Sequence, residues 1–314
     1  MTGATYNIVT RTQGNNAALK DGTVTPASFG FAFEEVNPLI GAFRSMVREL
    51  DHDICEMALT TYICAREHGV KFTALPIFLV RAFHHGAISV NTGAGIASPK
   101  DLEGRKVGVN RGYTVTTGVW ARGVLQDEHD VDLSKINWVL SGDEHVAEYC
   151  APANVVPIEA GKDMGDMLAA GELAAAIGVA VDHPNVGPLV PDALEAGLAA
   201  LRQRGHYPIN HLVVVRDDLL AEHPEIATET FEAFAESKRL YVDKLKAGEI
   251  ENPTKADEVH RRVMEITGDP LPYGIEPNRP VLEELIGHAV TQKIIAGPVS
   301  VGDLFAPGTH GLMG

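Results

Sequence analysis

The sequence contains little cysteine, few aromatic residues and no long apolar run. Its 314 residues include three cysteines, two tryptophans and only 6% aromatic residues. Cys55, Cys64 and Cys150 are odd in number and form no CxxC pair, which predicts reduced and mostly buried thiols. No stretch approaches the roughly 20 apolar residues of a membrane span, and residues 1–22 lack the apolar core of a signal peptide. These absences predict a soluble, cytoplasmic protein.

Positive charge is also scarce. The chain has 26 Lys and Arg against 42 Asp and Glu, which gives a formal net charge of −16. Such a surface repels phosphate backbones and anionic lipids, so neither nucleic acid nor membrane is an expected partner. Association with further copies of the chain stays open. A basic cluster such as RAFHH (81–85) then needs a local explanation.

Strand and helix patterns alternate along the chain, which is typical of an α/β fold. The chain is 45% hydrophobic, enough for a sizeable core in two domains or one large α/β unit. Residues 53–69 are expected to form one helix, with Asp53 as its N-cap, Gly69 at its end and both Cys55 and Cys64 along it. Buried strands are expected at 6–10, 72–80, 87–91, 106–110 and 136–140.

Several segments together resemble a known fold and a known family. SPKDLEGRKVGV (98–109) and GDMLAAGELAAAI (165–177) are similar to solute-binding proteins of the type II periplasmic-binding-protein fold. CEMALTTY (55–62), RAFHHGAI (81–88) and PYGIEPNR (272–279) resemble the 4,5-dihydroxyphthalate decarboxylase family, which uses this fold as an enzyme. The resemblance extends over almost the whole chain.

The resemblance implies two α/β lobes joined by two hinge strands, with a ligand cleft between them. Lobe 1 would comprise residues 1–88 and 211–314, and lobe 2 residues 89–210. The chain departs from the family pattern at His84, where arginine is common, at Asn210, where an apolar residue is common, and after the AAAI strand. These positions would face a cleft ligand, so the departures bear on the substrate rather than on the fold.

Two histidines would lie beside the hinge strands. His85 precedes the outgoing strand and His211 begins the returning one, so neighbouring hinge strands would bring them together. Successive strand residues point to opposite faces, so only one of His84 and His85 is expected to face the ligand. Glu56 is a candidate base or a partner that orients a histidine. For each of these residues a purely structural role remains open.

Other candidates would bind the substrate. Arg81 and Arg111 could each hold a carboxylate through a bidentate guanidinium. Arg111 opens RGYTVTTG, whose amides near Thr114, Val115 and Thr116 could hold an anion at a helix N-terminus. The remaining candidates are residues of the same loop or of neighbouring cleft loops: Gly112, Tyr113, Thr60, Thr61, Arg11 and Asn210. For both arginines an ordinary ion pair is the competing interpretation.

No metal or cofactor is expected. HExxH and HxxxH spacings do not accompany His84 and His85, so a structural zinc site has no support from spacing. A metal held by residues far apart in the sequence stays open. Nucleophilic hydrolysis lacks a motif, since neither GxSxG nor SxxK occurs.

The predicted function is cofactor-independent decarboxylation of a hydroxylated aromatic acid, a 4,5-dihydroxyphthalate-like dicarboxylate. In that chemistry His85 or His211 transfers the proton, Arg81 or Arg111 holds the retained carboxylate, and Glu56 orients the histidine or acts as base. Two alternatives stay open. One is a solute-binding protein for a small carboxylate without catalysis, and the other is a different lyase or hydrolase on the same scaffold.

Overall fold

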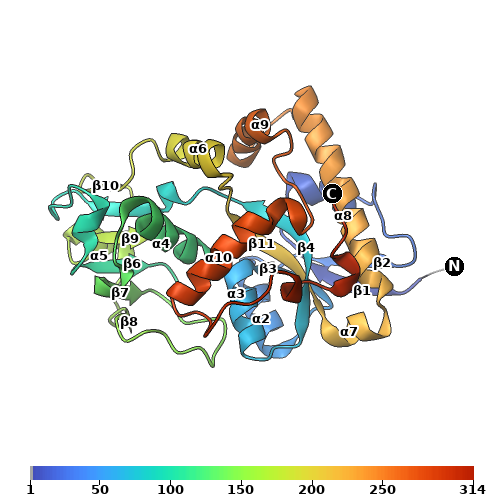
Figure 1. Ribbon diagram of the computed structural model, residues 1–314, viewed down its shortest axis with the longest axis horizontal. Helices are drawn as coiled ribbons and strands as arrows, with labels where there is room; N and C mark the ends of the chain where they lie inside the picture. The colour runs from blue at the N-terminus through green and yellow to red at the C-terminus, as the bar shows by residue number, and fades with distance from the viewer. Residues whose placement is uncertain (1–2) are drawn as a thin grey trace. The chain divides into compact units, whose positions relative to one another are not determined.

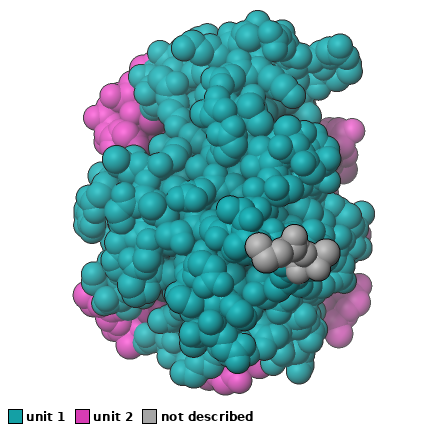
Figure 2. Space-filling view, turned by 90° about the vertical axis from the view of Figure 1, so that its right-hand side faces the viewer, with its two compact units in different colours: residues 1–81, 209–283, 299–314 teal, residues 82–208, 284–298 magenta. Residues whose placement is uncertain are grey.

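The computed structural model describes residues 3–314 as two compact units. Of the described residues, unit 1 comprises 3–81, 209–283 and 299–314, and unit 2 comprises 82–208 and 284–298. The three segments of unit 1 form one continuous body in Figure 2, although they are far apart in the sequence.

These bounds differ from the predicted lobes. Residues 82–88 belong to unit 2, because His85–Ala87 form a 3-10 turn that leads into the sheet of that unit. Residues 284–298 also belong to unit 2, so the chain passes between the units four times rather than twice. The helix α10 (Arg279–Thr291) contains one of these passages, between residues 283 and 284.

Unit 1 is built on a five-stranded sheet of order β2-β1-β3-β11-β4. Strand β1 pairs in parallel with β2 and β3, whereas β11 is antiparallel to both β3 and β4. The helices are coloured by sequence in Figure 1, where the long α8 is orange. The elements of this unit are β1 (Thr5–Val9), α1 (Ala17–Lys20), β2 (Gly30–Glu34), α2 (Ile40–Glu49), β3 (Ile54–Ala58), α3 (Leu59–Glu67), β4 (Phe72–Arg81), β11 (Ile209–Arg216), α7 (Asp217–Glu222), α8 (Glu225–Ala247) and α9 (Lys255–Thr267).

Unit 2 is built on a six-stranded sheet of order β10-β5-β9-β6-β7-β8. Its β6, β7, β8 and β9 pair in parallel, while β5 is antiparallel to β9 and β10. The elements are β5 (Ile88–Asn91), β6 (Lys106–Val109), α4 (Thr116–His129), β7 (Asn137–Leu140), β8 (Val155–Pro157), α5 (Met164–Ala170), β9 (Ala175–Ile177), β10 (Val186–Pro188) and α6 (Ala193–Arg204).

The expected helix over 53–69 is two elements. Residues 54–58 form the strand β3, which is buried on both faces, and the helix α3 begins only at Leu59. A strand covered on both faces reads as a continuous buried run and does not alternate, so its pattern is easily assigned to a buried helix. Cys55 therefore lies on a strand and Cys64 on a helix, and both are buried free thiols, whereas Cys150 is exposed.

No helix within residues 3–314 combines the length and the apolar character that crossing a membrane requires. The longest, α8, carries charged residues along its exposed side and ends at Gly248, which has a left-handed backbone.

Candidate active site

Unit 1 contains a histidine–carboxylate pair at the edge of its sheet. The Nδ1 atom of His211 lies 2.6 Å from Oε1 of Glu56. Glu56 is fully buried on β3, while 19% of the His211 side chain is exposed. The second carboxylate oxygen of Glu56 accepts a hydrogen bond of 2.9 Å from the backbone N–H of Arg11. A buried carboxylate held in this way fixes the orientation of the imidazole.

The backbone around His211 is irregular. The pairing of β11 with β4 shifts register on both sides of this residue, between Ile209 and His211 and again between His211 and Val213. Such irregularities are frequent next to active sites, where they re-aim a side chain. The ring of Phe43 meets the imidazole edge-on at 5.1 Å between centroids. The ring is therefore held by a carboxylate at one nitrogen and by an aromatic contact.

This arrangement can transfer a proton at Nε2. Because Nδ1 faces the Glu56 carboxylate, the neutral ring carries its proton on Nδ1 and offers a lone pair at Nε2. No residue between 3 and 314 hydrogen-bonds His211 Nε2, and part of the side chain reaches solvent. The interpretation of Glu56 as a partner that orients a histidine agrees with this geometry. The expectation that Glu56 lies at the start of a helix is wrong, since Glu56 lies on the strand β3.

Unit 2 contains a second histidine–carboxylate pair, formed by His85 and Glu128. His85 Nε2 lies 2.9 Å from Glu128 Oε2, and the histidine is completely buried. Arg204 donates a further hydrogen bond to the same carboxylate. The predicted approach of His85 to His211 joins residues of two different units and stays a prediction. In the structure each histidine has a carboxylate of its own.

His84 and His85 do not follow strand alternation. Strand β5 begins only at Ile88, and His84 precedes the 3-10 turn with φ of −108° and ψ of 3°. Both histidines are buried, so burial does not distinguish which of the two would face a ligand. The His84 ring stacks near Trp120 at 6.4 Å, and burial lowers the pKa of His84 to about 3. His84 is therefore a neutral side chain at physiological pH.

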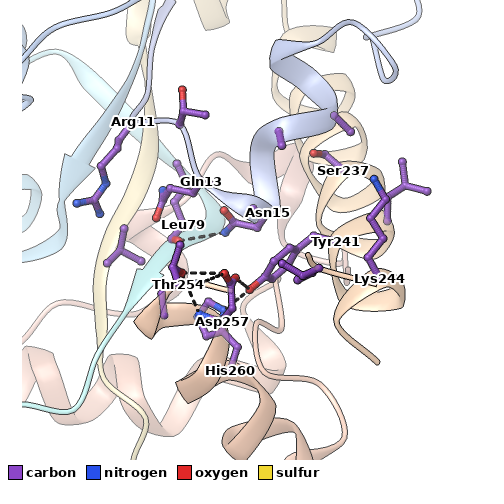
Figure 3. A pocket seen from close by; sticks show the side chains of 18 of the residues that line it. Arg11, Gln13, Asn15, Leu79, Ser237, Tyr241, Lys244, Thr254, Asp257 and His260 are labelled. Carbon is purple, nitrogen blue, oxygen red and sulfur yellow. Dashed lines mark hydrogen bonds between the residues drawn. The ribbon is translucent and has the colours of Figure 1, made fainter. Parts of the chain in front are cut away.

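A cavity with a volume of about 910 Å³ lies within unit 1. Its walls come from the loop after β1, the end of β4, and helices α8 and α9. Figure 3 shows Gln13, Tyr241 and His260 around this space, with Arg11 apart from the other labelled side chains. Val80, a cross-strand neighbour of His211, also lines the cavity. A cavity of this size can enclose a small aromatic acid.

Polar groups on the α8 and α9 walls are organised around Tyr241. Its hydroxyl hydrogen-bonds Asp257 and lies 2.8 Å from His260 Nδ1 (Figure 3). Asp257 also caps the N-terminus of α9 together with Thr254. Burial lowers the pKa of His260 to about 4, against the opposing charge of Asp257. The His260 ring is therefore neutral at physiological pH, whereas hydrogen bonds from Tyr241 and Thr254 lower the pKa of Asp257 and keep its carboxylate charged.

Buried polar atoms of two uncharged residues at the cavity have no hydrogen-bond partner within residues 3–314. They are Gln13 Nε2 and Ser237 Oγ, and both residues line the cavity. Ser237 is only 1% exposed. Buried donors without partners are costly, so polar atoms of this kind favour a bound molecule that accepts hydrogen bonds.

Arg81 lines the same cavity, and its guanidinium also makes hydrogen bonds to other residues of unit 1. Its guanidinium donates to Asn278 Oδ1 and to the carbonyl oxygen of Pro272, the latter at 3.3 Å. Two of the family-like segments, RAFHHGAI and PYGIEPNR, therefore meet through this side chain. The positive charge of Arg81 further lowers the pKa of His260.

The RGYTVTTG segment of unit 2 does not form the expected open cradle. The backbone amides of Tyr113 and Thr114, with the Thr114 hydroxyl at 2.7 Å, donate to the carboxylate of Glu144. The amide of Val115 instead bonds the carbonyl oxygen of Gly112. A Cβ atom at Gly112 would lie 2.5 Å from Glu144 Oε2, so a larger residue here would displace this carboxylate. The anion predicted for this loop is supplied by the chain itself.

The other residues of this segment have different surroundings. Tyr113 is buried beneath the guanidinium of Arg122, which lies 3.8 Å from its ring centroid. Thr116 is buried in the first turn of α4. Arg111 is exposed, has a left-handed backbone with φ of 70°, and lines a small cavity of about 120 Å³ at the start of α4.

Three further predicted residues lie in unit 1. Thr60 and Thr61 are fully buried in the first turn of α3, directly after the strand that carries Glu56. Asn210 precedes His211 on β11 and is 7% exposed. The structure thus brings Glu56 and His211 into contact and places Arg11 and Arg81 on one cavity.

The cavity walls formed by α8 and α9 were not predicted from the sequence. Ser237, Tyr241 and Lys244 recur at helical spacing on one face of α8, which is a signal that polar residues share a partly buried face. Their partners on α9 lie far along the sequence, so only the structure identifies the cavity that they enclose.

Sequence comparison identifies two related enzymes, while no family model matches the chain. A 4,5-dihydroxyphthalate decarboxylase of Comamonas testosteroni is 29% identical over 277 residues, which cover 83% of this chain and 84% of that protein. A 4,5-dihydroxyphthalate decarboxylase of Pseudomonas putida is 35% identical over 159 residues, 46% of this chain and 61% of that protein. The resemblance to these decarboxylases, predicted from the sequence, is confirmed.

Structural comparison identifies the fold. The alkanesulfonate-binding protein SsuA of Xanthomonas axonopodis pv. citri, bound to MOPS, superposes with a TM-score of 0.51 at 11% identity, covering 97% of this chain and 99% of that one. The desulfurization enzyme DSZB superposes with a TM-score of 0.52 at 14% identity and covers 96% of each chain. The predicted periplasmic-binding-protein-like α/β fold is confirmed, and both a binding protein and an enzyme share it.

Proposed function

We propose that the chain is a cofactor-independent decarboxylase of a hydroxylated aromatic carboxylic acid related to 4,5-dihydroxyphthalate. The activity is inferred from the two related decarboxylases, both of which are enzymes rather than binding proteins. The observation that carries the mechanism is the His211–Glu56 pair, a partly exposed imidazole oriented by a buried carboxylate.

In the proposed reaction, His211 delivers a proton to the ring carbon that bears the departing carboxylate. A new C–H bond forms, the C–C bond to the carboxylate breaks, and its electron pair returns to the ring as CO2 leaves. A hydroxyl para to that carbon assists by releasing its proton to solvent, which raises the electron density of the ring, and it takes up a proton again after CO2 has left. Glu56 stabilises the protonated imidazole before the transfer. Reprotonation of His211 by solvent completes the cycle.

The unit 1 cavity is the proposed location of the aromatic ring. Its walls at Leu79, Val80 and Ile250 are apolar, and Gln13 Nε2 and Ser237 Oγ offer hydrogen bonds to ring hydroxyls or to a carboxylate. Arg81 supplies positive charge for the retained carboxylate. Arg11 lies at the same cavity, and its backbone contacts Glu56, which links the cavity to the proton-transfer pair.

The test is CO2 release from a panel of substrates. The purified chain is incubated with 4,5-dihydroxyphthalate, phthalate and mono- and dihydroxybenzoates, with and without a chelator. The proposal expects turnover of at least one hydroxylated acid, none of phthalate, and no effect of the chelator. Absence of CO2 release across the panel would contradict it.

The fold itself supports a second function, a binding protein for a small carboxylate. The solved structures with this fold include a sulfonate-binding protein, so the fold alone does not distinguish an enzyme from a binding protein. Isothermal titration with the same acids separates the two. Tight binding without CO2 release would favour the binding protein, whereas release of CO2 that disappears in His211→Gln favours the decarboxylase.

A further inference from the structure

We propose that unit 2 contains a binding site for one divalent transition-metal ion, formed by Asp127 of α4 and by Glu284 and His288 of α10. Within the described residues this is the one group of three or more His, Cys, Asp or Glu side chains whose ligand atoms all lie within 4.8 Å of one another. The site is separate from the proposed decarboxylation, and the residues that carry it play no part in that mechanism.

The three donor atoms face a common point. His288 Nε2 lies 3.6 Å from Asp127 Oδ2 and 3.9 Å from Glu284 Oε1. Both distances exceed that of a hydrogen bond, and His288 makes none through Nε2 within residues 3–314. Two ligands on one tetrahedral zinc ion lie about 3.4 Å apart, given metal–ligand bonds of about 2.0–2.1 Å. The observed separations are close to that value.

The two helices are suited to this arrangement. Glu284 and His288 are four residues apart on α10 and so share one face of the helix. On α4, Gly123 lies one turn before Asp127, and a Cβ atom at position 123 would be 2.5 Å from His288 Nε2. The glycine therefore leaves room for the imidazole, which is 4% exposed and aimed at the two carboxylates.

Neighbouring side chains fix the orientation of the Glu284 carboxylate. Arg204 donates to Oε1 at 3.0 Å, and His206 Nδ1 lies 2.9 Å from Oε2. Outer partners of this kind orient the carboxylate and histidine ligands of metal sites. Each oxygen keeps a second lone pair, so Oε1 can accept from Arg204 and still bind a metal.

The charge of the cluster favours a cation. Glu128 and Glu284 share the single guanidinium of Arg204, and Asp127 adds a third carboxylate to the cluster. A divalent ion would compensate the remaining negative charge. One imidazole nitrogen with two carboxylate oxygens favours Zn²⁺ or Co²⁺, whereas Mg²⁺ prefers oxygen ligands and its own water shell. The Asp127 side chain is 36% exposed, which gives the ion access from solvent.

The experiment measures metal binding directly, on untagged full-length protein stripped with a chelator and dialysed. Isothermal titration with Zn²⁺ and visible absorption with Co²⁺ are recorded for the wild type, Asp127→Asn and His288→Gln. Glu283→Gln and His68→Gln are matched controls, since both residues are exposed and lie outside the cluster. Thermal unfolding with and without Zn²⁺ supplies a readout independent of the titration.

The wild type and both controls are expected to bind one Zn²⁺ per chain and to gain thermal stability from it. Asp127→Asn and His288→Gln should each weaken binding at least about tenfold and lose the Co²⁺ absorption bands. Mg²⁺ should not compete. Should His288→Gln fail to fold, Asp127→Asn decides, because its side chain is partly exposed.

Two results would overturn the site. One is a wild-type chain that binds no stoichiometric Zn²⁺, which would leave His288 as a packing residue beside the two carboxylates. The other is binding that Asp127→Asn and His288→Gln retain at full affinity, which would assign the ion to surface histidines. Neither result bears on decarboxylation, which is assayed separately by CO2 release.

Discussion

The His211–Glu56 pair of unit 1 and the His85–Glu128 pair of unit 2 contain the same two chemical groups in different surroundings. In unit 1 the carboxylate is fully buried and the imidazole is 19% exposed. In unit 2 the order is reversed, since His85 is fully buried and 25% of the Glu128 side chain is exposed. Only the first pair offers a ring nitrogen to an incoming molecule. Accessibility, rather than the identity of the pair, thus distinguishes a proton-transfer group from a packing group.

The largest expected effect is on turnover in His211→Gln. Loss of the proton donor should lower kcat by about 10²–10⁴-fold, the usual contribution of general acid–base catalysis. The measurement is CO2 release at saturating substrate, with circular dichroism to verify folding. His223→Gln, an exposed histidine of the same unit, is the control and should retain full activity. Activity near the wild-type level in His211→Gln would remove this residue from the mechanism.

A smaller loss is expected in Glu56→Gln. The amide can present its NH2 group to His211 Nδ1, which favours the tautomer with its proton on Nε2 and removes the negative charge beside the ring. We expect kcat to fall about 10²-fold with KM little changed, and the pH profile of kcat to move. Glu34→Gln, an exposed carboxylate near His52, is the matched control. A change in KM alone would show that Glu56 acts in binding instead.

His85→Ala tests the other half of the comparison. Removing the buried ring leaves Glu128 without one partner, and the free energy of unfolding should fall by about 2 kcal/mol. Urea denaturation measures this change, and CO2 release by the folded variant should stay within a few-fold of the wild type. Loss of turnover with unchanged stability would instead support a catalytic role for His85, as the sequence suggested.

The smallest expected effect is on the pH dependence of stability. Burial lowers the pKa of His84 to about 3 and that of His260 to about 4, against 6.5 in the unfolded chain. Both rings are neutral in the folded protein, so the stability that they contribute is present above pH 6.5. It decreases as the pH falls from 6.5 toward the folded pKa, because the unfolded chain then binds more protons.

Denaturation at several pH values between 7 and 4 tests this expectation in the variants His84→Gln and His260→Gln. Each should show a shallower loss of stability with acid than the wild type, and His84→Gln the larger change. Exposed His68→Gln is the control. Identical pH slopes in all four proteins would mean that these histidines are protonated in the fold.

The sequence predicted the strongly patterned parts of the structure. Strands 72–80 and 106–110 are found as β4 and β6, because continuous apolar runs between polar turns have few alternatives. The prediction from the sequence was wrong at β3, because this buried strand is followed directly by the helix α3. For Glu56 the sequence predicted a role, as a base or as a partner that orients a histidine. It did not predict the contact between Glu56 and His211. Its geometry depends on pairing between β3 and β11, which are far apart in the chain.

The cavity and the metal cluster were beyond sequence reasoning for a related reason. Asp127 and His288 belong to helices separated by almost half of the chain, and no local spacing connects them. Arg81 was predicted as a clamp from its residue type alone. The Asn278 and Pro272 acceptors that hold its guanidinium become visible only when the two segments meet.

The Glu144 carboxylate on the amides of Tyr113 and Thr114 has a consequence for affinity. It is a tethered competitor, present beside these donors at an effective concentration on the order of millimolar for a short linker. A free carboxylate can occupy the same amides only by displacing it. A free carboxylate that binds these amides no more tightly than Glu144 would therefore need a concentration above roughly millimolar to displace it.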